Sequence, residues 1–205
     1  MSIKKYLLPA LIAGLMPLPA LAADGVIDSG DTAWILISTA LVMIMTPGLA
    51  FFYAGMVRSK NAVSTLYQNF IALGVIGIVW AVIGYSLAFS EGNSLIGGTG
   101  FAMLKGVGQT ASEGSTIPHM LFMIFQMMFA IITPALMIGA FAERIKFKAW
   151  VLFLILWSLA VYSPVAHWVW GPNGWIANSG GLDFAGGIVV HITAGYSALV
   201  AALVF

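Results

Sequence analysis

The stretch TAWILISTALVMIMTPGLAFFYAGMV, residues 32–57, decides the fold class of this chain. It contains no charged residue. A helix needs about 20 predominantly apolar residues to cross the hydrocarbon core of a bilayer. The stretch therefore predicts a membrane-spanning helix.

Four further segments have the same length and apolar character, and they predict an all-α membrane protein with five transmembrane helices. Their expected bounds are about 67–89, 117–142, 149–168 and 183–205. We expect Asp31 or Thr32 to cap the first helix and Ser115 or Thr116 to precede the third.

The composition supports a membrane protein and excludes several other classes. Of 205 residues, 61% are hydrophobic and 7% are charged, whereas soluble domains carry about 25% charged residues. The chain has no cysteine, which excludes disulfides, thiolate metal sites and a cysteine nucleophile. A net charge of +1 gives no case for a nucleic-acid partner. The sequence shows no nucleotide loop, catalytic triad or metal-ligand cluster, so we expect no enzyme, no cofactor and no metal.

The first residues, MSIKKYLLPALIAGLMPLPALAADG, have the pattern of a secretory signal. Lys4 and Lys5 precede a short apolar stretch that ends in Ala20-Leu21-Ala22. We expect a cleavable signal peptide at residues 1–22 and a mature domain at residues 23–205. The alternative is an uncleaved first membrane helix, which the three prolines of the stretch disfavour.

The basic residues predict the orientation in the membrane. Arg58 and Lys60 follow the first helix, and Arg144, Lys146 and Lys148 follow the third. The second connection holds only Lys105, and the fourth has no lysine or arginine. Because positive residues mark the cytoplasmic side, we expect a multi-pass protein of the cytoplasmic (inner) membrane with its mature N-terminus outside.

The last residues, ITAGYSALVAALVF, stop without a cap, a glycine stop or a basic flank. Helices normally end with such signals. We therefore expect this chain to be a fragment of a longer protein. The alternative is a natural terminus just inside the membrane.

Two ionisable residues in the last apolar run are candidate functional residues. His191 lies eight residues after Asp183, about 12 Å deeper along a helix. A helical face joins it to small residues at Gly187, Ala194, Gly195 and Ala198.

Ionisable groups at membrane depth usually face a bundle interior or a cavity. A buried structural histidine is the alternative for His191. For Asp183, an N-terminal helix cap is favoured over a chemical role.

Aromatic residues and prolines complete the candidate features. Phe125 and Phe129 share one helical face, as core residues often do. Tryptophans such as Trp168 and Trp170 usually anchor a membrane interface, but they can also hold a cation against their ring faces. We expect Pro47, Pro134 and Pro164 to interrupt their helices, and His119 and His167 to be interfacial.

Several long motifs, in order, resemble the ammonium transporter / Rhesus (Amt/Rh) family, and the bacterial ammonium transporter branch in particular. They are TPGLAFFYAGMVRSKN, GYSLAFSEGN, FQMMFAIITPALMIGAFAERIKF, PVAHWVWGPNGW and GLDFAGGIVVHITAG. The resemblance covers the chain from about Asp31 to Phe205. It implies a homotrimer of eleven-helix subunits built from an inverted repeat of five plus five helices. This chain then corresponds to the truncated first repeat, the N-terminal half.

The resemblance also implies roles for individual residues. His191 matches the first of two pore histidines, and Phe129 matches an outer phenylalanine gate. Trp170, together with Phe125 and Phe129, matches the outer site that recruits the cation. Asp183 matches an aspartate that holds that site together, and Gly187 lies on the same helix beside it.

The function implied is ammonium/ammonia transport, with cation recruitment at the outer aromatic site and passage of ammonia past His191. Membrane lipid surrounds the protein, and a PII-type regulatory protein is an expected partner. The alternative is the membrane domain of an ammonium sensor coupled to a signalling module. A non-functional bundle is a third reading.

Overall fold

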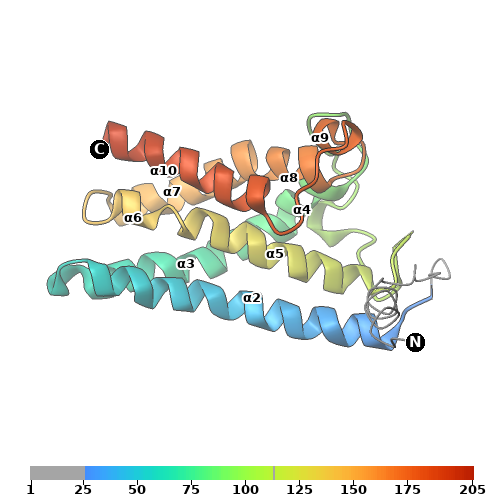
Figure 1. Cartoon of the computed structure of the whole chain (residues 1–205), viewed down its shortest axis with the longest axis horizontal. Coiled ribbons are helices and arrows are strands. Elements are labelled where there is room, and N and C mark those ends of the chain that lie inside the picture. The colour runs from blue at the N-terminus through green and yellow to red at the C-terminus, as the bar shows by residue number, and fades with distance from the viewer. Residues whose placement is uncertain (1–25, 113) are drawn as a thin grey trace, which may run out of the picture.

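The computed structural model describes residues 26–112 and 114–205, so the expected signal peptide at residues 1–22 lies outside the described residues. Within the described part, five helical segments are long and apolar enough to cross a membrane. They run lengthwise beside one another (Figure 1). The predicted all-α membrane fold with five spanning helices is confirmed. The five segments are Ser29–Met56, Ser59–Phe89, His119–Phe141, Phe147–Asn178 and Gly187–Val204.

The first segment is one continuous helix, α2 (Ser29–Met56). Its N-cap is Asp28, whose carboxylate accepts a 2.8 Å hydrogen bond from the backbone N–H of Asp31. The prediction of a cap at Asp31 or Thr32 is therefore wrong by one turn. The expected interruption at Pro47 is also wrong, because α2 continues through it.

The second segment starts before the predicted residue 67, and one π-helical turn interrupts its α-helix. It begins in the 3-10 turn η1, where the Ser64 hydroxyl donates to the carbonyl of Asn61 at 2.9 Å. The elements are η1 (Ser59–Asn61), α3 (Ala62–Val79), the π-helix η2 (Trp80–Gly84) and α4 (Tyr85–Phe89).

The third segment is α5 (His119–Ala135), followed after a break by α6 (Ile138–Phe141). Pro134 lies inside α5, one residue before its end, so the helix is interrupted just after this proline. The helix starts at His119 and the residue before it is Pro118, so the expected start at about residue 117, preceded by Ser115 or Thr116, is two residues too early. The connection that precedes α5 contains the short 3-10 helix η3 (Ala102–Leu104).

The fourth segment widens into a π-turn just before Pro164. Since Pro164 has no N–H, the carbonyl of Ala160 cannot accept the α-helical hydrogen bond from it. A π-turn is one way for a helix to absorb such a missing bond. The elements are α7 (Phe147–Trp157), the π-helix η4 (Ser158–Tyr162), α8 (Ser163–Trp170) and the short α9 (Trp175–Asn178).

The fifth segment starts as the π-helix η5 (Gly187–Ile192) and continues as α10 (Thr193–Val204). This is the third π-turn among the described helices, after η2 and η4. Such π-bulges are frequent at functional sites. His191 lies in this turn.

Helix α5 lies at the centre of the bundle and α2 lies at its edge. In their most apolar stretches 67% of the residues of the α5 segment are buried, against 17% for α2. Large side chains fill the interior, and Trp80 of η2 meets Tyr162 of η4 with ring centroids 5.9 Å apart. The two π-turns therefore pack against each other.

The connections separate into two ends (Figure 1). The start of α2, the long connection between α4 and α5, and α9 lie at one end. The turn after α2, the turn after α6 and the end of α10 lie at the other. This arrangement positions the site described next, which is built at the end where α8 and α9 meet.

Candidate functional site

Two phenylalanines of α5 form the floor of the site. Phe125 and Phe129 have ring centroids 5.0 Å apart and ring planes at 90°. The four-residue spacing places both rings on one helical face. This perpendicular arrangement is one that aromatic rings prefer, because the edge of one ring meets the face of the other.

Trp170, the last residue of α8, brings a third ring to this pair. Its ring centroid lies 6.3 Å from that of Phe129, with the planes at 62°. Its indole Nε1 donates a 3.0 Å hydrogen bond to the backbone carbonyl of Asp183. This bond fixes the ring between α8 and the segment that leads into η5. The structure thus brings together the three aromatic residues predicted from the sequence.

The three rings line a recess of about 340 Å³. Its wall also includes Phe184, whose side chain is fully exposed, and one polar residue, Gln126. The complete lining is Phe89, Phe122, Phe125, Gln126, Phe129, Trp170, Phe184 and Ala185. Ring faces carry negative electrostatic potential, so the recess suits a small cation.

Asp183 caps the start of the fifth segment. Its carboxylate accepts hydrogen bonds from the backbone N–H groups of Gly187 at 2.7 Å, Ile188 at 2.8 Å and Val189 at 2.9 Å. Burial raises the pKa of Asp183, but the backbone N–H groups outweigh burial and hold the pKa below its usual value. The capping role expected from the sequence is seen in the geometry.

Gly186 is the glycine that this turn requires. Its φ of +83° is in the left-handed region, which side chains rarely adopt. A Cβ there would lie 2.8 Å from Cγ2 of Val190. At Gly187, by contrast, the nearest atom to an added Cβ is Oδ1 of Asp183 at 3.8 Å, so within the described chain no helix packs against it.

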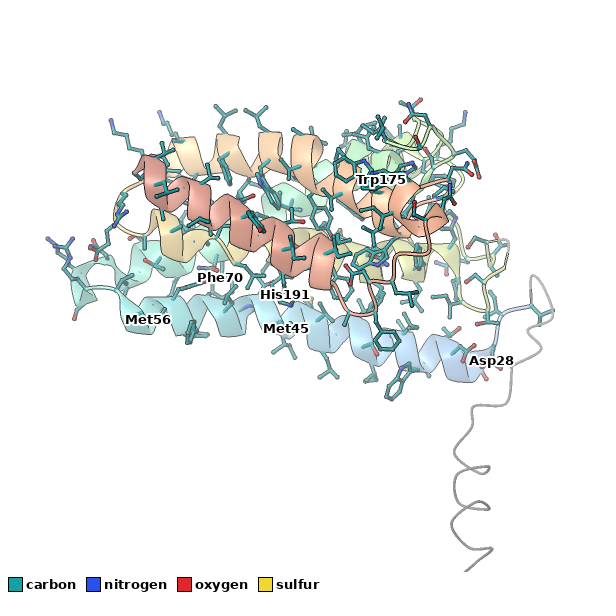
Figure 2. All side chains as sticks on the ribbon, turned by 45° about the horizontal axis from the view of Figure 1, so that its top comes forward. Asp28, Met45, Met56, Phe70, Trp175 and His191 are labelled. Atoms are coloured by element: carbon teal, nitrogen blue, oxygen red, sulfur yellow. The ribbon has the colours of Figure 1, made fainter. Side chains whose placement is uncertain are left out.

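His191 lies about midway along the bundle, on the side of the fifth segment that looks toward α2 (Figure 2). Its backbone N–H bonds to the carbonyl of Gly186 at 2.9 Å. Its side chain is exposed in this chain, as are Gly187 and Gly195, whereas Ala194 is buried. Gly187, His191 and Gly195 therefore share an exposed face, as the helical spacing predicts, whereas Ala194 lies in the bundle interior.

The other two histidines are buried. His167 is completely buried, and its Nδ1 and Nε2 lie 2.9 and 2.8 Å from the carbonyls of Ala88 and Asn93. His119 is 8% exposed, with Nε2 2.7 Å from the hydroxyl of Tyr85. These contacts join α4 to α5 and α8, and the bond to Asn93 fastens the long connection to α8, which is a structural role.

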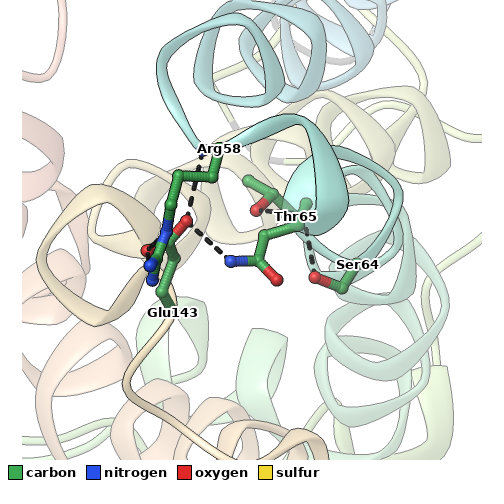
Figure 3. A network of polar contacts seen from close by, with 5 residues as sticks. Arg58, Ser64, Thr65 and Glu143 are labelled. Carbon is green, nitrogen blue, oxygen red and sulfur yellow. Dashed lines mark hydrogen bonds and ion pairs between the residues drawn. The ribbon is translucent and has the colours of Figure 1, made fainter.

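At the opposite end of the bundle a polar clamp joins the turn after α2 to the turn after α6 (Figure 3). The carboxylate of Glu143 forms an ion pair with the guanidinium of Arg58 and accepts a 2.7 Å hydrogen bond from Nδ2 of Asn61. These bonds hold the pKa of Glu143 at about 2. The clamp brings together the two connections that hold most of the basic residues.

Sequence reasoning missed Gln126. The signal was present, since this residue is the one amide within an apolar helix and polar side chains at membrane depth are commonly functional. In the part of the chain that the structure describes, no group of three or more His, Asp or Glu residues could hold a metal ion.

Comparison with known proteins identifies the family. The model of the Ammonium Transporter Family matches residues 33–205. An ammonium transporter of Bacillus subtilis (strain 168) is 56% identical over 176 residues, which make up 85% of this chain and 43% of that protein.

Two solved structures have the same fold. The crystal structure of Candida albicans Mep2 superposes with a TM-score of 0.79 at 39% identity, over 86% of this chain and 39% of that one. A structure described as a sensor Amt protein superposes with a TM-score of 0.77 at 28% sequence identity. The match covers 84% of this chain and 43% of that one. The chain thus spans less than half the length of these relatives. The family model spans the five helices, and the sequence identity to the Bacillus subtilis transporter is 56%. The chain therefore belongs to the ammonium transporter family.

Proposed function

We propose that this protein transports ammonium/ammonia across the cytoplasmic membrane. The observation that carries the proposal is the aromatic recess of Phe125, Phe129 and Trp170, built at the end of five membrane-length helices in a chain of this family. The recess recruits the ammonium cation, and ammonia then passes His191.

The physics of the recess suits recruitment followed by release. A bare ion is far more costly than neutral ammonia in an apolar path. Cation–π attraction contributes about 0.5–2 kcal/mol, which is enough to concentrate the cation and weak enough to let it leave. Phe129 separates this recruitment site from the path below and acts as a gate.

His191 lines the path for ammonia. An imidazole offers one hydrogen-bond donor and one acceptor, and ammonia needs both. Asp183 and Gly187 are structural residues of the site, because the carboxylate holds the N–H groups at the start of η5. The π-turn then determines where the His191 side chain projects.

The orientation proposed for the membrane follows from the basic residues. Arg58 and Glu143 bring the first and third connections to one end of the bundle, and positive residues at that end indicate the cytoplasm. The recess then lies outside, as does the mature N-terminus after cleavage at about residue 22. We include in the proposal a homotrimer of inverted-repeat subunits and a PII-type regulator at the cytoplasmic end.

A sensor is the second candidate function. The specific observation that favours it is the fold match to the structure described as a sensor Amt protein, at a TM-score of 0.77. A sensor binds ammonium without comparable flux, so a transport measurement separates the two functions.

The experiment is uptake of labelled methylammonium by bacteria that lack their own ammonium transporters and express this protein at its full natural length. We expect His191→Ala to lower uptake at least tenfold or to admit potassium. The control is Tyr196→Phe, which alters a polar side chain five residues along the same segment. Unchanged uptake and unchanged exclusion of potassium in His191→Ala would remove His191 from the path. Ammonium binding without uptake by the unmodified protein would favour the sensor.

A further inference from the structure

Gln126 has an unsatisfied polar atom beside the aromatic recess. Its Oε1 is buried and has no hydrogen-bond partner. A buried acceptor without a partner loses its hydration and gains nothing in return. Each such atom in a native structure therefore calls for an explanation, such as a bound water or a ligand.

The position of Gln126 links this atom to the recess. It precedes Phe129 by three residues, a spacing that places the two side chains on one side of α5, and it follows Phe125 directly. The same three residues line the recess together with Trp170. Gln126 is thus the polar residue among the aromatic residues that line the recess.

The chemistry of an amide complements that of the rings. Ring faces attract any small monovalent cation, because the attraction is electrostatic. An amide carbonyl accepts a directed N–H hydrogen bond. The terminal torsion of glutamine is broad and roughly two-fold, so a half-turn exchanges Oε1 with Nε2 and can direct the acceptor into the recess.

Resting on the function proposed above, we propose that Gln126 is a specificity-determining residue of the recess, whose Oε1 accepts an N–H hydrogen bond from the recruited ammonium. The rings supply attraction for a cation, and the amide supplies preference for one that donates hydrogen bonds. Potassium has no N–H to donate and prefers several oxygen ligands. The recess offers it a single amide oxygen.

The test is a pair of substitutions at Gln126 in the full natural-length protein, assayed by methylammonium uptake with ammonium and potassium as competitors. Gln126→Met keeps the length of the side chain and removes the acceptor. We expect its KM to rise about tenfold or more, as for the loss of one hydrogen bond to a charged group, with maximal uptake unchanged. Gln126→Glu keeps an acceptor, so we expect its KM not to rise above that of the unmodified protein.

The matched control is Gln68→Met, the same chemical change at a buried glutamine of α3. We expect the competition constant of ammonium to weaken in Gln126→Met while that of potassium stays unchanged. An unchanged KM in Gln126→Met would overturn the inference. So would a lowered melting temperature without a change in KM, since that result indicates a structural water on Oε1.

The outcome also separates this inference from the proposed function. If the unmodified protein shows no uptake, the proposed function fails and the inference fails with it. If uptake is present and Trp170→Leu raises KM while Gln126→Met does not, transport and the recess stand and only the role of Gln126 is overturned.

Discussion

The indole Nε1 of Trp170 donates a 3.0 Å hydrogen bond to the backbone carbonyl of Asp183, while the carboxylate of the same aspartate accepts three backbone N–H groups of η5. One residue thus anchors the aromatic recess and the start of the helix that carries His191. A substitution in the aromatic recess is therefore expected to affect the start of η5, and a substitution at the start of η5 is expected to affect the recess.

The ring of Trp170 and its N–H group make separable contributions. Trp170→Leu removes the ring face, and we expect KM for methylammonium to rise about 2- to 30-fold, the range that corresponds to 0.5–2 kcal/mol of cation–π attraction. Trp170→Phe keeps a smaller ring face and loses the bond to Asp183, so the rise in KM should be smaller than for Trp170→Leu. Uptake kinetics of the two variants check this order, and equal effects would contradict it.

Replacing Asp183 by asparagine leaves one acceptor oxygen for several N–H groups and removes the negative charge at a helix start. We expect Asp183→Asn to destabilise the protein by about 1–3 kcal/mol, seen as a lower melting temperature in detergent. Asp28→Asn is the matched control, because Asp28 caps one N–H of α2 and asparagine is an equally good N-cap. A loss of the same size in both variants would show that the multiple bonds to Asp183 do not matter.

The cap also predicts a dependence on pH. The folded-state pKa of Asp183 lies below its usual value. The contribution of its carboxylate to the free energy of unfolding is therefore fully present above about pH 4, the unfolded value. It is lost as the pH falls through the lower folded value. We expect the melting-temperature difference between the unmodified protein and Asp183→Asn to shrink below about pH 4, and a constant difference down to pH 2 would be inconsistent with this.

Gly186 should tolerate no side chain. Gly186→Ala introduces a Cβ at a positive φ, 2.8 Å from Cγ2 of Val190, and left-handed backbone costs about 1–2 kcal/mol for a residue with a Cβ. We expect a lower melting temperature and reduced uptake. Gly74→Ala in α3, where an added Cβ meets nothing within 4 Å, serves as the control and should be neutral or stabilising. Equal melting temperatures would argue against strain at Gly186.

The clamp between Arg58 and Glu143 should hold two connections together. We expect Glu143→Gln to increase amide hydrogen exchange several-fold around residues 57–61 and 142–146, because local opening is governed by such contacts. Arg58→Gln should have the same effect, and the double variant should add little. With a Glu143 pKa of about 2, the ion pair persists at all pH values above about 3. Additive effects of the two substitutions would mean that the groups act independently.

The sequence by itself determined the membrane fold, since five long apolar segments have no other stable arrangement than helices in a bilayer. The cost of ionisable groups at membrane depth also indicated His191 and Asp183. The roles of Phe125, Phe129 and Trp170 were implied by the family resemblance, since helical spacing alone leaves core packing and membrane anchoring open for them. The capping role of Asp183 followed from its place before a glycine pair.

Only the tertiary structure decided how these residues meet. The 6.3 Å approach of Trp170 to Phe129 and the bond of its indole to Asp183 join α8, α5 and the start of η5, and no local pattern encodes a distance between helices. The π-turn at Gly187–Ile192, which no spacing pattern indicated, also became visible only in the structure. The unsatisfied oxygen of Gln126 became visible only once packing had removed it from water, because a missing hydrogen bond is a property of the surroundings and not of the residue.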